Sequence, residues 1–385
     1  MQASAEKKEK RVLVIAGEAS GDNYGSRLIR ELKSISPERE IWAIGGDHME
    51  REGARLISHY SAISVVGLVE VAGRLPRITA LLKEVKGLIR RGEVQCLVLI
   101  DFPDFNFIVG KYAKKHGIPV IYYVPPQLWA WREGRAKILK AISTHVIVPF
   151  PFEVDFFRGH RLDVQYYGHP LLEILRDEGV NTERTESAEA KEGGRIRVGI
   201  FPGSREAEVE RMLPLQMEAA AILKDRHGDI GFFLPLANSS LRRNIERIVG
   251  DFRQDVVIRE KKNYEIFHEI DLAIASSGTV TLELAIFGVP TVIIYKVSPL
   301  TYIIGKMLVK IDRIGLPNIV TGEKIFPEFV QNDATPLNIA DGIDAFLGDA
   351  SLVERVREKS RELMVTLCGD GPSKRVADLV EKELK

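Results

Sequence analysis

The sequence is poor in cysteine, in long apolar runs and in charge of one sign. Its 385 residues include two cysteines, Cys96 and Cys368, which are too few for a disulfide framework or a cysteine-based metal cluster. No run reaches the roughly 18 apolar residues of a membrane span, and the initial MQASAEKKEK lacks the apolar segment of a signal peptide. Lys plus Arg and Asp plus Glu number 54 each, which argues against a nucleic-acid partner. We therefore expect a cytoplasmic protein that is soluble or peripherally bound to a membrane.

Two common nucleotide-binding signatures are missing from the first turn. Residues 11–17 predict a strand, and the GEASGD turn at 17–22 leads into a helix from about residue 23 to 33. The turn has neither the lysine of a phosphate-binding P-loop nor the G-x-G-x-x-G spacing, so neither ATP hydrolysis nor dinucleotide binding is supported. Its glycines allow a ligand to approach the backbone, and Ser20 and Asp22 are therefore candidate residues for binding that ligand.

Strands and helices alternate along the chain, which predicts an α/β fold. The pattern restarts with a strand at 197–201, after a polar segment without periodicity. We expect two doubly wound, Rossmann-like domains facing a cleft at their carboxyl edges, followed by C-terminal helices. The expected parts are a first domain at 1–172, a linker at 173–194, a second domain at 195–345 and helices at 346–385. These helices either pack back on the first domain or swap to a partner chain.

Residues 271–296 predict one strand-helix-strand unit whose helix begins at Gly278. Free N–H groups at a helix start favour a phosphate. Glu283 lies one turn after Thr279 and can accept hydrogen bonds from the hydroxyls of a sugar. The candidates for binding a nucleotide-sugar are Ser277, Gly278, Thr279 and Glu283. The alternative is that Ser277 and Thr279 only cap the helix and that Glu283 faces water.

Two carboxylates follow the buried strand at 94–100. Asp104 precedes the helical FNFIVGKYAKK and is expected to cap that helix. Asp101 comes directly after the strand, at the edge where open α/β sheets keep their chemistry. We therefore expect Asp101 to be functional and Asp104 to be structural.

An aromatic loop follows the strand predicted at 118–124. Its Trp129, Trp131 and Arg132 place ring faces beside positive charge, an arrangement that can hold a sugar phosphate. A packed loop next to an exposed basic helix explains the same residues equally well. His169, near the end of the first domain, is expected to be structural.

Residues 64–79 are apolar although glycines and Pro76 interrupt them. Arg74 and Arg77 add positive charge, as in segments that bind at a membrane interface. The candidate membrane patch consists of Val65, Val66, Leu68, Val69, Val71 and Leu75. The alternative is a core helix whose basic residues are solvated.

Seven motifs occur in one order along the chain: GEASGD at Gly17, DFPDFN at Asp101, WAWR at Trp129, GHPL at Gly168, PGSRxxEV at Pro202, SSGTxxLE at Ser276 and GLPNI at Gly315. Together they make residues 11–367 resemble the lipid-A-disaccharide synthases, glycosyltransferases of the two-domain architecture called GT-B. The resemblance implies an inverting transfer from UDP-2,3-diacylglucosamine to the 6-hydroxyl of 2,3-diacylglucosamine 1-phosphate. The products would be UDP and a β(1→6)-linked disaccharide 1-phosphate.

The resemblance also implies roles for individual residues. Asp101 would be the base that accepts the proton of the acceptor hydroxyl, and Glu18 and Asn318 carry over as site residues. Arg205 and the helix start at Ser204 would stabilise the leaving UDP, and Glu283 would hold its ribose. No D-x-D pair occurs in the sequence, in keeping with the chemistry without metal or cofactor that the resemblance implies.

Membrane contact and a homodimer are further implications of the resemblance. The family uses the region of residues 64–79 to touch the cytoplasmic face of the inner membrane, and a domain-swapped dimer is compatible with it. Ala72, Thr79 and Arg211 depart from the family pattern, which predicts a weaker or more charge-dependent membrane contact.

Two other classes of protein share part of this pattern. An enzyme similar to UDP-N-acetylglucosamine 2-epimerase would use the same SSGTxxLE segment but would not need an apolar, basic surface. A glycolipid-binding protein without turnover would not need Asp101 together with Arg205, because binding alone requires no base.

Overall fold

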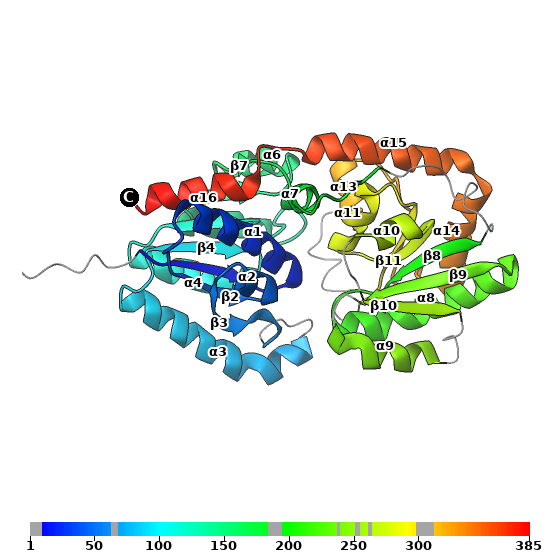
Figure 1. The fold of residues 1–385 in the computed structure, drawn as a ribbon, viewed down its shortest axis with the longest axis horizontal. Coiled ribbons are helices and arrows are strands. Elements are labelled where there is room, and N and C mark those ends of the chain that lie inside the picture. Colours follow the sequence, from blue (N-terminus) through cyan, green and yellow to red (C-terminus); the bar gives the residue numbers. More distant parts are fainter. Residues whose placement is uncertain are drawn as a thin grey trace, which may run out of the picture. The chain divides into compact units, whose positions relative to one another are not determined.

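The computed structural model describes residues 10–62, 68–183, 195–236, 239–250, 255–260, 264–297 and 312–385, with the side chains of 68–74 left out. The chain forms two compact units. The first unit combines Met1–Asp177 with Leu367–Lys385, and the second is Glu178–Thr366. Each unit is a parallel sheet with helices on both faces, so the predicted α/β class is confirmed (Figure 1).

The described part of the first unit contains a seven-stranded parallel sheet in the order β3-β2-β1-β4-β5-β6-β7. Its strands are β1 (Val12–Ala16), β2 (Ile41–Gly45), β3 (Arg55–His59), β4 (Cys96–Ile100), β5 (Val120–Tyr123), β6 (His145–Val148) and β7 (Gln165–Tyr166). Every residue of the central strands β1 and β4 is buried, as a parallel sheet covered on both faces requires.

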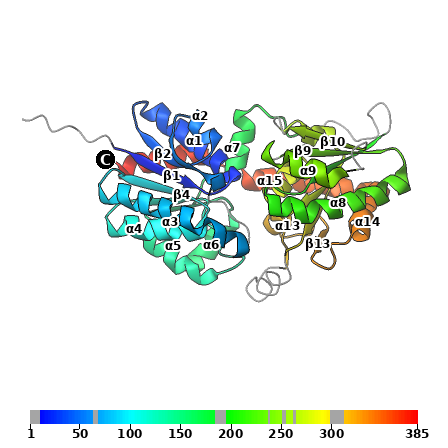
Figure 2. The ribbon, with the colours of Figure 1, turned by 90° about the horizontal axis from the view of Figure 1, so that it is seen from below.

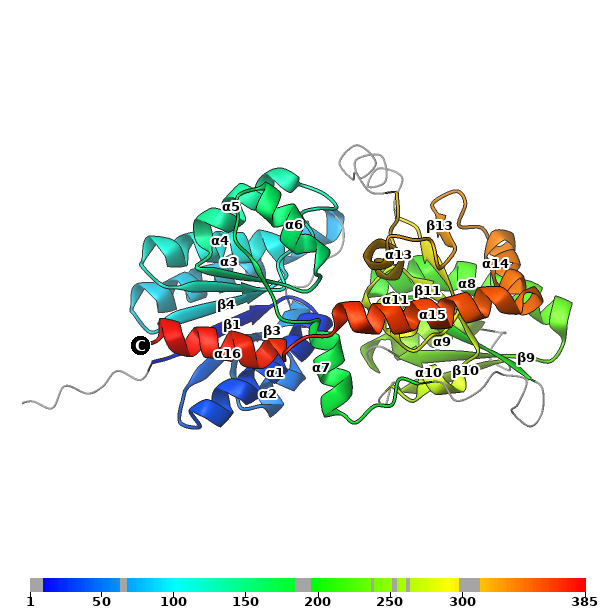
Figure 3. The same ribbon diagram turned by 90° about the horizontal axis from the view of Figure 1, so that it is seen from above.

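Helices cover both faces of this sheet (Figures 2 and 3). One layer contains α1 (Ala19–Ile35), α2 (Asp47–Arg51), α7 (Pro170–Asp177) and α16 (Pro372–Glu383). The other contains α3 (Leu68–Arg90), α4 (Pro103–Lys115), α5 (Ala136–Ile142) and α6 (Phe152–Gly159), with short 3-10 turns at Tyr60–Ala62 and Glu133–Arg135. In this second layer, Leu81, Val85 and Leu88 of α3 pack into the apolar core.

The second unit repeats the arrangement with a six-stranded parallel sheet in the order β10-β9-β8-β11-β12-β13. Its strands are β8 (Ile196–Phe201), β9 (Ile230–Leu236), β10 (Val256–Glu260), β11 (Leu272–Ser276), β12 (Thr291–Tyr295) and β13 (Glu328–Val330).

Two groups of helices flank this second sheet. In the first group, α8 (Glu206–His227) packs against α9 (Arg242–Val249) and α14 (Pro336–Gly348). In the second group, α11 (Thr279–Ile286) packs against α13 (Leu316–Thr321), and α15 (Ala350–Leu367) contacts the end of α11. A hydrogen bond of 2.7 Å from Ser360 Oγ to the carbonyl of Ile286 makes that last contact. A single turn, α10 (Ile266–Glu269), and a 3-10 turn at Ser239–Leu241 complete the unit.

Three helices differ from their predicted course. Helix α1 begins at Ala19, four residues before the predicted start, so Ser20 and Asp22 lie in its first turn. Pro76 lies inside α3 and Pro214 inside α8, and both helices run through the proline. A proline removes one helix hydrogen bond, and in α8 the helix continues because buried residues such as Leu213 and Gln216 flank the proline on both sides.

Helix α16 returns to the first unit and packs against α1. Its first turn is held by the buried Glu173 of α7, whose Oε2 accepts hydrogen bonds from Ser373 N (3.2 Å) and Ser373 Oγ (2.5 Å). Burial raises the pKa of Glu173, and the two hydrogen bonds from Ser373 counter part of that shift. The carboxylate therefore acts as the cap that Gly371, the residue before the helix, lacks.

No helix in the described ranges is both long enough and apolar enough to cross a bilayer.

Ser373→Ala is expected to lower the free energy of unfolding by about 1.5–3 kcal/mol, because it removes a buried hydrogen bond to a charged group. The matched control is Lys374→Ala, an exposed position in the same turn, which should change stability by less than about 0.5 kcal/mol. Urea unfolding of both variants measures the difference. Equal stability of the two variants would show that Glu173 does not hold the helix.

Candidate active site

Candidate functional residues of the first unit meet where its strand order reverses. Strands β1 and β4 are neighbours, with Ala16 level with Ile100, while their following helices lead to opposite sides of the sheet. Ligands of open α/β sheets bind at such a switch point, beyond the carboxyl ends of the strands. A Cβ atom at Gly17 would overlap the ring of Phe102, so the turns after β1 and β4 are in contact. Glu18 and Asp101 therefore come to one edge of the sheet.

The backbone of Asp101 is held in an unusual conformation. Asp101 and Phe102 both have left-handed φ angles, of 44° and 48°, which cost a non-glycine residue roughly 1–2 kcal/mol. The Asp101 carbonyl accepts hydrogen bonds from Tyr122 Oη (2.8 Å) and Asn106 Nδ2 (2.7 Å), and its N–H donates to Val124 O (2.9 Å). Strain of this kind persists where the surroundings over-determine it, often at functional sites. Hydrogen bonds to its main chain thus fix the backbone of Asp101, whose side chain is half-buried.

Asp104 does not cap helix α4, so that prediction is wrong. Pro103 occupies the first helical position and Phe102 the cap position, which leaves Asp104 inside the first turn. Its exposed carboxylate instead contacts Arg135 Nη1 at 2.7 Å and Arg132 Nη1 at 3.6 Å. Asp104 thus ties α4 to the segment that follows the aromatic loop.

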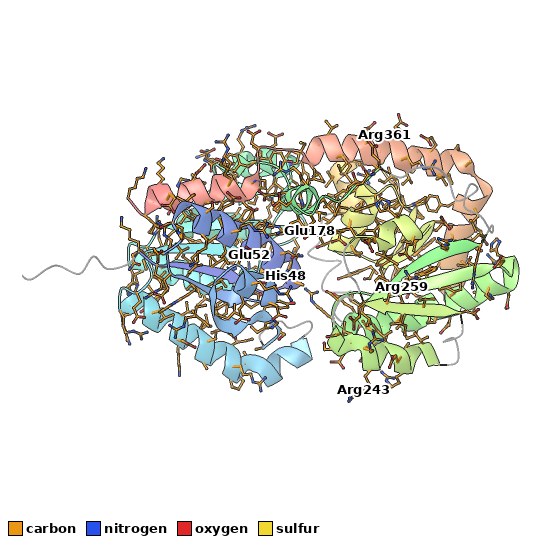
Figure 4. The ribbon with its side chains drawn as sticks, in the orientation of Figure 1. His48, Glu52, Glu178, Arg243, Arg259 and Arg361 are labelled. Carbon is orange, nitrogen blue, oxygen red and sulfur yellow. The ribbon has the colours of Figure 1, made fainter. Side chains whose placement is uncertain are left out.

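Asp22 has a structural explanation. Its buried carboxylate accepts hydrogen bonds from the backbone N–H groups of Gly46 (2.7 Å), His48 (3.1 Å) and Met49 (3.2 Å) at the start of α2. His48 is labelled in Figure 4 and marks this turn. The carboxylate therefore positions the turn after β2, and Ser20 is half-buried in the adjoining first turn of α1.

The two tryptophans of the aromatic loop differ in environment. Trp129 Nε1 donates to Glu153 Oε1 at 2.7 Å, and its ring packs edge-on against Phe152. Trp131 is 38% exposed, with the Arg132 guanidinium 4.2 Å from its ring centre. Trp129 thus anchors the loop, and Trp131 with Arg132 forms its accessible part.

Buried ionisable groups support this loop. Glu153 is fully buried, which raises its pKa to about 8, although hydrogen bonds from Trp129 and from the N–H of Phe150 oppose the shift. His169 is also buried, which lowers its pKa to about 3 and keeps the ring neutral. The backbone N–H of His169 donates to Leu367 O, so His169 joins the GHPL segment to the end of α15. Its ring Nδ1 accepts a hydrogen bond from the backbone N–H of Leu171.

The second unit has its own switch point, between β8 and β11. These strands are neighbours, with Phe201 level with Ala275, and each is followed by a short turn and a helix. Arg205 is the cap residue of α8 and Gly278 that of α11. Two helix N-termini therefore lie at one sheet edge, where their N–H groups and partial positive charges favour an anion.

Side chains around these helix starts have distinct environments. Glu283 is 8% exposed, so the alternative that it faces water is wrong; α11 from Thr281 onward is buried on all sides. Ser277 Oγ donates to Ile314 O at 2.8 Å, while Thr279 is half-buried and Gly278 exposed. Ser277 thus braces the turn, and Gly278 and Thr279 are its accessible part.

Asn318 is a buried scaffold. Its Nδ2 donates to Phe326 O and Glu328 Oε1, and its Oδ1 accepts from the N–H groups of Ile325 and Phe326. The Glu328 carboxylate also accepts from Ile314 N and Gly315 N. Asn318 therefore acts on a ligand site indirectly, by holding the GLPNI segment in place.

Several supporting residues escaped the sequence analysis. Glu153 and Glu328 lie outside the seven motifs, and their roles depend on partners more distant in sequence, such as Trp129 and Asn318. Asn106 is the last residue of DFPDFN, and its contact with the Asp101 carbonyl could have been sought within that motif. Glu208 lies within PGSRxxEV and could have been found from its place three residues after Arg205. The described ranges contain no group of three or more His, Cys, Asp or Glu side chains placed to hold a metal ion.

Part of the candidate membrane patch lies outside the description. Val65 and Val66 are outside the described residues, as are the side chains of Leu68, Val69 and Val71. Leu75 is described and is 50% exposed on α3. Ile108 of α4 is another exposed apolar side chain of this unit, 43% exposed.

Solved structures with a similar fold include an epimerase and a glycosyltransferase. UDP-GlcNAc 2-epimerase from Neisseria meningitidis, bound to UDP-GlcNAc, aligns over 97% of this chain and 99% of its own, with a TM-score of 0.62 and 12% identity. A spinosyn rhamnosyltransferase complexed with thymidine diphosphate aligns over 96% and 100%, with a TM-score of 0.60 and 12% identity. Identities this low show the fold alone, and the fold is that of the GT-B class.

Sequence comparison narrows the class to one family. The family model of lipid-A-disaccharide synthetase matches residues 12–367. Lipid-A-disaccharide synthase of Geobacter sulfurreducens is 40% identical over 96% of both chains, and that of Nitrosococcus oceani is 34% identical over 96% of this chain and 95% of its own. The chain belongs to the lipid-A-disaccharide synthase family.

The buried Glu153 predicts a pH-dependent stability. Its pKa is about 8 in the folded protein and 4.5 in the reference state, so the stability that protonated Glu153 contributes is lost as pH rises from 4.5 through 8. Glu153→Gln should remove this loss, which amounts to several kcal/mol because each pKa unit is about 1.4 kcal/mol. Melting temperatures from pH 5 to 9 test this, with the exposed Glu38→Gln as the control. If the melting temperature of Glu153→Gln falls with rising pH as much as that of the wild type, Glu153 is not the source of the pH dependence.

Proposed function

We propose that the protein transfers 2,3-diacylglucosamine from its UDP derivative to the 6-hydroxyl of 2,3-diacylglucosamine 1-phosphate. The proposal rests on the residues found at the two switch points of a chain that belongs to the lipid-A-disaccharide synthase family. One edge presents the carboxylates Glu18 and Asp101. The other presents Arg205 beside two helix N-termini. An inverting sugar transfer needs a base on one side and anion stabilisation on the other.

Asp101 is the proposed base. As the acceptor O6 attacks C1 of the donor sugar, its proton passes to the Asp101 carboxylate and the bond between C1 and the UDP oxygen breaks. The clamped backbone of Asp101 supports this role, because hydrogen bonds to its main chain hold the residue in place at the edge of the sheet. Glu18, on the contacting turn, is the second carboxylate of this edge and is proposed to orient the acceptor.

The second unit is proposed to bind UDP. The leaving diphosphate gathers negative charge, which the Arg205 guanidinium and the N–H groups at Ser204, Gly278 and Thr279 would stabilise. Glu283 lies one turn inside α11 and would accept hydrogen bonds from the ribose. No cofactor takes part in the proposed reaction.

Both proposed substrates carry acyl chains, so we propose that the first unit contacts the inner membrane surface. The exposed Leu75, the positive charge of Arg77 and the exposed Trp131 support this contact. In the structure, α16 packs on α1 of its own chain. The domain-swapped homodimer stays a prediction.

A product assay tests the function directly. The purified protein is incubated with UDP-2,3-diacylglucosamine and 2,3-diacylglucosamine 1-phosphate, and the products are analysed by mass spectrometry. The proposal requires a disaccharide 1-phosphate and an equal amount of UDP. Epimerisation of UDP-N-acetylglucosamine without a disaccharide would favour the 2-epimerase alternative, and substrate binding without turnover would favour a glycolipid-binding protein.

Asp101→Asn should lower kcat by about 10²–10⁴-fold, the usual contribution of a general base. Asparagine tolerates the left-handed backbone, so the fold and UDP affinity should be preserved. Asp104→Asn is the matched control: it loses an exposed ion pair, should cost at most about 1 kcal/mol of stability and should keep most of its turnover. If Asp104→Asn is inactive and Asp101→Asn is active, the two roles have been exchanged.

Leu75→Ser should reduce flotation of the protein with liposomes that contain anionic lipid, because it removes an exposed apolar side chain from the proposed contact. Residual binding should fall further as salt is raised. Leu337→Ser is the control, since Leu337 is 52% exposed on α14 of the second unit. Flotation of Leu75→Ser at the level of the wild type would exclude this surface.

A further inference from the structure

A carboxylate of the protein itself occupies the anion-favouring turn after β8. Glu208 Oε2 accepts a hydrogen bond from Ser204 N (3.0 Å), and Glu208 Oε1 accepts from Arg205 Nη1 (2.8 Å). Both donors belong to the set that would serve a diphosphate. The Glu208 side chain is 28% exposed and that of Arg205 is 31% exposed, so the pair is accessible to a solute.

The turn is shaped to admit this carboxylate. Gly203 has a φ of 119°, which favours glycine, and a Cβ atom there would overlap both Glu208 Oε2 and Glu208 Cβ. The absence of a side chain at Gly203 therefore lets Glu208 lie across the start of α8. The charges of Glu208 and Arg205 also act on Tyr295, at the end of β12: partial burial and then Glu208 raise the pKa of Tyr295, while Arg205 and Arg211 lower it. Tyr295 is thus within electrostatic reach of the same ion pair.

A helix cap alone explains only part of this arrangement. A glutamate in the first turn commonly reaches back to a backbone N–H group near the helix start. Here the other carboxylate oxygen binds the guanidinium of Arg205, so the same group neutralises the cation that the proposed reaction uses. Glu328 offers a contrast, because its donors include the fully buried Asn318 and leave it in a fixed scaffold.

We infer that Glu208 is a resident anion, a positioning residue that holds Ser204 N and Arg205 until a nucleotide diphosphate replaces its carboxylate. The inference rests on the proposed function and deepens it. While the site is empty, the ion pair with Glu208 holds the Arg205 guanidinium at the helix start. When the diphosphate arrives, phosphate oxygens take over both hydrogen bonds.

This exchange has two consequences. UDP binds more weakly than it would to an unoccupied turn, because it must displace an ion pair. UDP also leaves more readily after transfer, because the carboxylate returns to the same donors. Glu208 therefore moderates product inhibition by UDP.

The test compares Glu208→Gln with Glu206→Gln. Glu206 is exposed in the same first turn of α8, so its substitution makes the same change of charge beside the same helix start. Calorimetry is expected to show UDP binding about tenfold tighter to Glu208→Gln than to the wild type, with less than a twofold change in Glu206→Gln. The inhibition constant of UDP as a product should fall by the same factor as the dissociation constant.

The direction of the change separates the two readings of Glu208. If Glu208 is only a helix cap, Glu208→Gln will bind UDP equally or more weakly, and this result overturns the inference. An equal gain in Glu206→Gln also overturns it, since general charge would then explain the effect. A melting curve confirms that each variant is folded. If Glu208→Gln is not folded, Glu208→Asp, which keeps the charge on a shorter side chain, serves as the second variant.

Wild-type UDP binding separates failure of the inference from failure of the proposed function. A folded wild-type protein that binds no UDP contradicts the proposed function itself. A wild-type protein that binds UDP, together with a Glu208→Gln variant that does not bind it more tightly, contradicts the role of Glu208 alone.

Discussion

The reversal of strand order within each sheet is the constraint on which the candidate site depends. At β1/β4 and again at β8/β11, neighbouring parallel strands send their following helices to opposite faces of the sheet. The turns after these strands are therefore not covered by the next helix, and their polar groups are available to a ligand. Glu18 and Asp101 follow one pair of strands, and Arg205 and Gly278 follow the other. Chemistry is thus assigned to places that the topology leaves open.

Keeping those turns in shape requires buried polar groups elsewhere. Asp22 accepts three backbone hydrogen bonds at the start of α2, and Asn106 and Tyr122 hold the carbonyl of Asp101. In the second unit, Asn318 and Glu328 hold the GLPNI segment, and Ser277 donates a hydrogen bond to Ile314, the residue before that segment. Buried hydrogen bonds of this kind hold the turns that they join in one conformation. They explain why many polar residues of the motifs never reach the surface.

The sequence was sufficient to predict the fold class and the strands whose ends carry the candidate site residues. Short apolar runs followed by polar residues or turn residues located β4, β8 and β11, and the residues just after each run are those placed at the sheet edges. Three local judgements needed the structure. Asp104 looked like a helix cap because it precedes an apolar helix, yet Pro103 moved the helix start and left Asp104 to bind Arg135. Trp129 could not be separated from Trp131 by sequence, because the partner of its indole, Glu153, is a distant residue. Glu283 was ambiguous because spacing alone does not tell which helix face is buried.

The most direct test of the account is a hydrogen-exchange measurement with and without UDP. If the β8/β11 edge binds the nucleotide, UDP should slow amide exchange in residues 203–209 and 277–283, where the helix starts of α8 and α11 supply N–H groups. The turns at 17–22 and 101–106 should then keep their exchange rates, because the β1/β4 edge is proposed to bind the acceptor sugar and not UDP. Protection of residues 17–22 and 101–106, with unchanged exchange in the second unit, would contradict the division of roles between the two sheets.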